Sequence, residues 1–260
     1  MKTIDILNFI DSFAPFNTAL PFDNAGLLVG SGEKEIKKIG IVLDVTAEAA
    51  EYAAQNGIDL IVSHHPVIFN PLKKLETESV PYFLAKHDIA VISAHTNLDA
   101  AKGGVNDALA KALELEDITP LAEGGSDGFP PMGRIGTLKQ PISDEEFAKF
   151  VAEKLSTKAK AVLGGRQISK VALWGGAGED FIMPAVYAGA DALVTADVKH
   201  HNLLLAKSLG LCLIDAGHFE TENVIVPILA EKIADFSDTK TVVIPNLPPP
   251  YGFDFLAITR

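Results

Sequence analysis

The feature that most constrains the fold of this chain is an internal repeat, in which the second half follows the plan of the first. Residues 38–65 read KIGIVLDVTAEAAEYAAQNGIDLIVSHH. Residues 170–201 align with them and read KVALWGGAGEDFIMPAVYAGADALVTADVKHH. Farther along, residues 211–222, LCLIDAGHFETE, lie over residues 89–100, IAVISAHTNLDA. The repeat predicts two related α/β lobes, which we expect to face each other about a pseudo-two-fold axis.

Within the first repeat, short runs of β-branched residues alternate with longer helical patterns. The expected strands cover 37–45, 58–65 and 89–95, and the expected helices cover 46–57, 79–88 and 103–113. Such alternation is typical of βαβ units around a largely parallel sheet. Outside the repeats, the pattern predicts an amphipathic helix over 1–13 and a helix over 143–155, where Ser143 and Glu146 form a capping box.

The middle of the chain separates the two repeats. Residues 115–136 are rich in Gly, Pro and Asp, a composition typical of a loop or linker. We therefore expect a first lobe over 1–125 and a second lobe over 126–260, with no large inserted domain between them.

Composition narrows the classes of function. The net charge of −12 disfavours non-specific binding to nucleic acid and leaves room only for a local basic patch. The single cysteine, Cys212, has no internal disulfide partner, which suits a reducing compartment. No apolar run reaches the roughly 18 residues of a membrane span, and the amino terminus has no signal-peptide pattern. We expect a cytoplasmic protein without a membrane partner.

Most of the seven histidines follow expected strand ends, where open α/β sheets bind ligands. The polar residues at these ends are His64 and His65, then His95, Asn97 and Asp99, then Lys199, His200 and His201, and finally Asp215, His218 and Glu222. This clustering of imidazoles with carboxylates predicts a metal site.

Five of these residues form the expected ligand set: His64, His65, Asp99, His218 and Glu222. His218 and Glu222 are four positions apart at the start of a helical pattern, which places them on one face. Three imidazoles and two carboxylates exceed the needs of one four-coordinate ion with an open position. They suit two ions roughly 3.5–4 Å apart. This donor set favours zinc, manganese, iron or nickel over magnesium or calcium.

Each of these groups also has a plain structural interpretation. The paired histidines could be satisfied loop residues, Asp99 could cap a helix, and His218 with Glu222 could be an ordinary helical pair. His95 and His201 could shuttle a proton, orient a ligand or make a structural hydrogen bond. The glycine-rich stretch 174–178, WGGAG, could cradle a phosphate or form a tight turn.

Four motifs resemble the Nif-three-like family (NGG-one interacting factor three-like), whose members are often named GTP cyclohydrolase 1 type 2 homologues. They are PFDNAGLLVG (21–30), SHHPVIF (63–69), AHTNLDAAKGGVNDALA (94–110) and DAGHFETE (215–222). The resemblance implies that the five expected ligands occupy the family's two-metal positions. It also implies two α/β lobes with the metals in the cleft, a compact form, and assembly into a ring-like homohexamer.

The expected function is metal-dependent hydrolysis, with a water bridging two ions as the nucleophile. The family name suggests GTP as the substrate, but the sequence has no P-loop and no N-K-x-D element. Cyclohydrolase activity therefore follows from resemblance alone. The alternative is a non-catalytic metal-binding scaffold or regulatory protein that forms a ring. A third possibility, nucleic-acid binding in a ring lumen, is disfavoured by the acidic balance.

Overall fold

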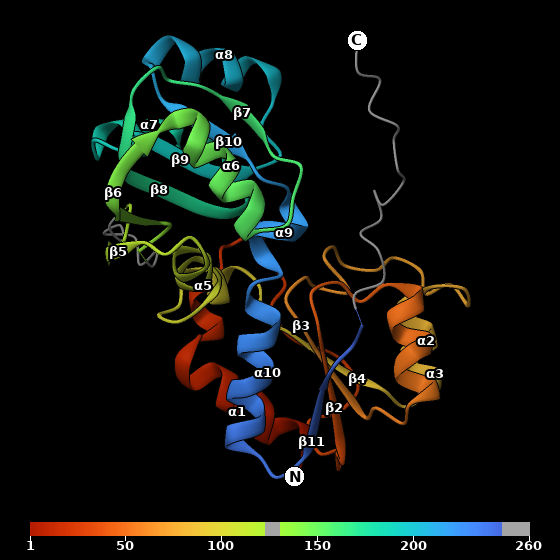
Figure 1. Ribbon diagram of the computed structural model, residues 1–260. Coiled ribbons are helices and arrows are strands. Elements are labelled where there is room, and N and C mark those ends of the chain that lie inside the picture. Colours follow the sequence, from red (N-terminus) through yellow and green to blue (C-terminus); the bar gives the residue numbers. More distant parts are fainter. Residues whose placement is uncertain (123–130, 246–260) are drawn as a thin grey trace.

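A computed structural model describes residues 1–122 and 131–245, which form two mixed sheets flanked by helices (Figure 1). The first sheet has the order β1-β4-β3-β2-β11. Its strands are β1 (Gly26–Val29), β2 (Lys38–Val42), β3 (Leu60–Ser63), β4 (Ala90–Ser93) and β11 (Lys240–Val243). The strands from β4 to β11 are parallel, and β1 pairs antiparallel with β4.

Helices cover both faces of the first sheet. They are α1 (Thr3–Phe13), the 3-10 turn η1 (Phe16–Thr18), α2 (Ala47–Gln55), α3 (Val80–Lys86), α4 (Thr96–Ala100) and α10 (Ile225–Phe236). Helix α5 (Val105–Ala112) contributes to the cores of both sheets. Alternate strand residues point to opposite faces. Ile39 and Ile41 therefore pack with α1 and α10, whereas Val42 packs with α2 and α3. Burial on both faces accounts for the nearly continuous apolar runs in the sequence.

The second sheet has the order β5-β6-β8-β9-β10-β7. Its strands are β5 (Glu116–Thr119), β6 (Arg134–Ser143), β7 (Lys160–Val162), β8 (Gln167–Ala177), β9 (Ala192–Ala196) and β10 (Cys212–Asp215). Its helices are α6 (Asp144–Lys154), η2 (Glu179–Phe181), α7 (Ile182–Tyr187), α8 (His200–Leu209) and α9 (His218–Glu222). Strands β8, β9 and β10 are parallel. Helix α6 packs on one face, and α7 and α8 pack on the other.

Two local expectations outside the repeats are confirmed, and one is wrong in part. Helix α1 forms as expected. Ser143 Oγ accepts a hydrogen bond from the Glu146 amide, and the Ser143 amide donates one to Glu146 Oε2. The expected loop over 115–136 contains a strand, because β5 pairs antiparallel with β6. Part of that loop, 123–130, lies outside the described residues.

The repeat corresponds to two units with the same order of connections. Strands β2, β3 and β4 are joined by α2 and α3, as β8, β9 and β10 are joined by α7 and α8. The strand registers also agree. Ser63 of β3 lies opposite Ser93 of β4, and Thr195 of β9 lies opposite Asp215 of β10. Each unit leads into a short helix, α4 in the first lobe and α9 in the second.

The expected division at residue 125 differs from the structure at both ends of the second lobe. Strand β5 lies before that boundary but belongs to the second sheet. Helix α10 and strand β11 lie after it but return to the first lobe, where β11 pairs with β2. Hydrophobic burial explains this return, since Leu229 and Ile233 of α10 are buried against the strands of the first sheet. No helix within the described ranges is long and apolar enough to cross a membrane.

Candidate metal centre

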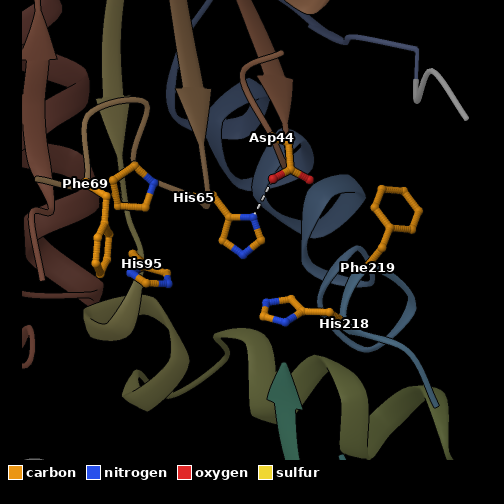
Figure 2. A pocket seen from close by; sticks show the side chains of 7 residues that line it. Asp44, His65, Phe69, His95, His218 and Phe219 are labelled. Atoms are coloured by element: carbon orange, nitrogen blue, oxygen red, sulfur yellow. Dashed lines mark hydrogen bonds and ion pairs between the residues drawn. The ribbon is translucent and has the colours of Figure 1, made fainter. Parts of the chain in front are cut away.

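Four imidazoles meet at the carboxyl ends of β3 and β4 in the first sheet and of β10 in the second sheet. His64 and His65 follow β3 directly, His95 comes just after β4, and His218 begins α9 after β10. The ring centroids of neighbouring pairs are 5.0–5.6 Å apart. Figure 2 shows His65, His95 and His218 around one space. The structure thus brings His95, which sequence reasoning placed outside the ligand set, into contact with the expected ligands.

Two buried carboxylates enter the same cluster, and Glu222 faces two groups of donors. Its Oε2 lies 2.8 Å from His65 Nε2 and 3.1 Å from His218 Nε2, whereas its Oε1 lies 3.8 Å from His64 Nε2. Asp99 Oδ1 lies 3.5 Å from the same His64 nitrogen. Three sets have donor atoms close enough to hold a metal ion: His64, Asp99 and Glu222; His65, His218 and Glu222; and His64, His65 and His95.

Two atoms of this cluster are buried without a partner. Within the described parts of the chain, His64 Nε2 and Asp99 Oδ1 make no hydrogen bond. Leaving such atoms unsatisfied costs about 1–3 kcal/mol each. A cation between them would satisfy both, and imidazole with carboxylate is a donor set that transition metals accept. The residues present therefore fit a divalent metal ion.

The Nδ1 atom of every ring in the cluster is held by an acceptor. His64 donates to the Ala94 carbonyl at 2.8 Å. The other acceptors are carboxylates: Asp44 for His65 at 2.7 Å, Asp23 for His95 at 2.8 Å and Asp197 for His218 at 2.6 Å. A proton fixed on Nδ1 leaves Nε2 as the atom that can bind a metal.

Sequence reasoning missed these three carboxylates. Asp44 and Asp197 each stand just after a parallel strand, which is a signal that could have found them, whereas Asp23 lies in a loop before β1.

The ionisable groups are strongly perturbed in the ion-free protein. Burial disfavours the charged form of His65, but hydrogen bonds to Asp44 and Glu222 outweigh it and raise the pKa to about 10. His218 behaves in the same way, and its hydrogen bond to Glu222 helps to raise the pKa to about 9. Burial raises the pKa of Asp99 to about 7. Glu222 is also buried, yet hydrogen bonds from imidazoles hold its pKa well below the usual value. Protons thus supply positive charge around Glu222 when no cation does.

The glycine-rich stretch 174–178 lies mostly in β8, where the register with β9 shifts, and neither sequence interpretation of it was right. The Gly175 amide donates to Asn106 Oδ1 and the Gly176 amide donates to Thr221 Oγ1, so both are occupied by side chains. A Cβ on Gly176 would lie 2.2 Å from Glu222 Oε1. The glycine therefore provides the space in which the Glu222 carboxylate sits.

Two residues lie elsewhere than the sequence suggested. Asp99 lies inside α4 and not before a helix. His201 is exposed in the first turn of α8 and belongs to none of the metal-competent groups in the described ranges. Residues 197–199 connect β9 to α8, and Asp197 has a positive φ of 55°. Asp197, and not His200 or His201, therefore holds His218 of the cluster.

A cavity of about 360 Å³ opens beside the imidazoles (Figure 2). Its lining consists of Asp44, His65, Pro66, Phe69, His95, His218 and Phe219. This volume is at the small end of ligand-binding pockets. A small molecule in it would contact three imidazoles of the cluster.

Together these features define an α/β protein with two sheets and a buried imidazole and carboxylate cluster that can hold metal. Residues 1–249 match the Duf34/NIF3 (NGG1p interacting factor 3) family, and the chain belongs to that family.

Relatives and solved structures agree with this membership. A Clostridium perfringens protein named GTP cyclohydrolase 1 type 2 homolog is 34% identical, over 97% of this chain and all of that protein. A Methanocaldococcus jannaschii protein of the same name is 37% identical, over 85% of this chain and 90% of that protein. A Bacillus cereus protein related to NIF3 has a TM-score of 0.89 at 26% identity, covering 97% of this chain and 99% of its own. Reduced HcgD from M. jannaschii has a TM-score of 0.82 at 32% identity, covering 94% and 98%.

Proposed function

We propose that this protein is a metal-dependent hydrolase that holds two divalent ions per chain in a cleft between its lobes. His64 and Asp99 would hold one ion, His65 and His218 would hold the other, and Glu222 would bridge them. Zinc, manganese, iron and nickel are the candidate metals. The observation that carries the proposal is the position of Glu222, whose two oxygens face two separate donor groups. The matching order of connections in the two lobes supports a pseudo-two-fold relation between them.

The chemistry assigned to the bound ions is Lewis-acid activation of water and of the substrate. The chain's own residues orient the donors and supply a proton path. Asp44 and Asp197 keep Nε2 of His65 and His218 directed at Glu222. His95 lines the cavity with its Nδ1 held by Asp23, which suits proton transfer to a leaving group.

The cavity favours an enzyme over a non-catalytic scaffold. A structural metal site is closed by protein ligands, whereas a catalytic site keeps access for a substrate. His65 and His218 both line the cavity, so one donor group faces a space that a small molecule can enter.

We further propose a cytoplasmic homo-oligomer, a hexameric ring by resemblance. Leu72, Leu75 and Leu204 are among its exposed apolar side chains, and such surface is suited to contacts between subunits. Light scattering on the purified protein tests this assembly, since a single chain in solution would contradict it.

The test of the function compares ion content with hydrolysis in three proteins purified without added metal or chelator. They are the wild type, Glu222→Gln and the control Glu220→Gln, which alters a neighbouring carboxylate on the same helix. GTP, phosphoesters and cyclic amides are the substrates assayed. We expect close to two ions per chain and turnover in the wild type and the control, and loss of both in Glu222→Gln. Full ion content with unchanged turnover in Glu222→Gln would refute the proposal, and ions without any turnover would favour the scaffold.

A further inference from the structure

The cavity beside the imidazole cluster has an unusual combination of walls. Phe69, from the loop after β3, and Phe219, from α9, both line it, and they lie at opposite sides of the imidazoles in Figure 2. Among the described residues that form the lining, none is a lysine or an arginine. From these walls we infer that the substrate is an uncharged, flat ring compound and not a nucleotide or other polyanion. This inference rests on the proposed function and specifies its substrate class.

The charge around the cluster disfavours an anionic substrate. Five carboxylates lie in it or hold its imidazoles: Asp23, Asp44, Asp99, Asp197 and Glu222. A pair of divalent ions would bring about four positive charges, which these five carboxylates offset. A triphosphate would therefore meet no net positive charge at the metal-loaded cluster.

The exposed phenyl rings beside the cluster favour a flat ligand. Phe69 is 44% exposed, and its ring centroid lies 6.4 Å from that of Phe22, which is 63% exposed and stands outside the cavity lining. The ring of Phe69 also meets His95 in an edge arrangement, with centroids 6.3 Å apart. Phenyl rings left open beside a polar cluster offer stacking surface to a flat ligand. The polar groups of the cluster then face the edge of that ligand, where an amide-like carbon would react.

The size of the cavity agrees with this class. About 360 Å³ lies at the small end of ligand-binding pockets and accommodates a small ring compound. A substrate that reacts at a ring carbon would place the ring near His65 and His218 and direct any substituent to solvent.

The experiment compares the binding of matched ligands that differ only in their phosphates. Guanosine and GTP form one pair and uridine and UTP form the other, titrated by calorimetry and ligand-observed NMR into protein carrying the metal found on purification. We expect each nucleoside to bind at least as tightly as its triphosphate. We also expect Phe69→Ala and Phe219→Ala to weaken nucleoside binding about fivefold or more without loss of ions, because base stacking is lost. Tyr187→Ala removes a ring that is 81% exposed and does not line the cavity, and it serves as the control.

Two results would overturn the inference: a triphosphate that binds about tenfold more tightly than its nucleoside, or no nucleoside binding at millimolar concentration. Both readouts are independent of turnover. A protein that binds the nucleosides but hydrolyses nothing would therefore refute the proposed hydrolase while supporting the ring-binding cavity. A protein that hydrolyses only phosphorylated substrates would support the proposed hydrolase and refute the ring-binding cavity.

Discussion

Replacing Gly176 by alanine tests the geometry of the metal centre with one methyl group. The residue has a φ of +69°, and its Cβ would lie 2.2 Å from Glu222 Oε1 and 3.0 Å from His218 Nε2. Ordinary contact begins near 3.4 Å, so the Glu222 oxygen must move by about 1 Å or more. Metal–oxygen bonds of about 2.0–2.2 Å tolerate deviations of only about 0.2 Å. We expect Gly176→Ala to lose most of its bound metal.

A matched control separates this effect from backbone strain. Gly189 has a φ of +72°, and a Cβ there would meet nothing within 4 Å. Both substitutions cost about 1–2 kcal/mol because alanine disfavours the left-handed region. For a protein of this size that corresponds to a decrease in Tm of about 2–8 °C. Only Gly176→Ala carries the additional clash with Glu222.

The assay measures ion content by elemental analysis and stability by thermal unfolding, with circular dichroism as the check on folding. We expect Gly189→Ala to keep the wild-type ion content and Gly176→Ala to fall well below it. If the folded Gly176→Ala protein binds as many ions as Gly189→Ala, then Glu222 does not bind metal where the structure places it.

Three further predictions concern the groups around Glu222. Asp44→Asn should weaken metal affinity by about 10–100-fold, because His65 loses the carboxylate that orients it. Competition with a chelator measures the affinity, with substitution of an exposed residue, Asp235→Asn, as the control. Equal affinities in the two variants would contradict the prediction. Metal binding near pH 7.5 should release about two protons, because the His65 and His218 rings, with pKa values of about 10 and 9, must each lose a proton to bind metal. Calorimetry in buffers of different ionisation enthalpy measures the number of protons released, and a value of zero would contradict the prediction. The ion-free protein should lose stability as the pH rises through 9 to 10. A histidine pKa that is raised in the folded protein stabilises the fold fully below the unfolded pKa near 6.5, and this stabilisation is lost above the folded pKa. A free energy of unfolding in denaturant that is unchanged from neutral pH to that range would contradict this prediction.

The sequence was a good guide where local chemistry decides position. The alternation of strands and helices predicted two sheets, because apolar runs of that length require burial on both faces. The spacing of His218 and Glu222 placed both on one face of a helix, and Pro66 after the paired histidines indicated where the chain leaves β3. These residues do meet in one cluster.

Features that depend on tertiary packing were not visible in the sequence. Strand β11 is a short run of four residues outside the repeats, and only its pairing with β2 assigns it to the first lobe. The position of His201 depended on the connection over 197–199, whose length the repeat did not specify. Asp23 is remote in sequence from His95, and the contact between them exists only in the folded chain.

The most direct test of the central claim is anomalous diffraction at the metal absorption edges, from crystals of protein purified without added metal or chelator. The proposal predicts two peaks per chain, one at His64 and Asp99 and the other at His65 and His218, with one oxygen of Glu222 near each. No peak at the cluster, or one peak bound by a single oxygen of Glu222, would contradict the dinuclear centre.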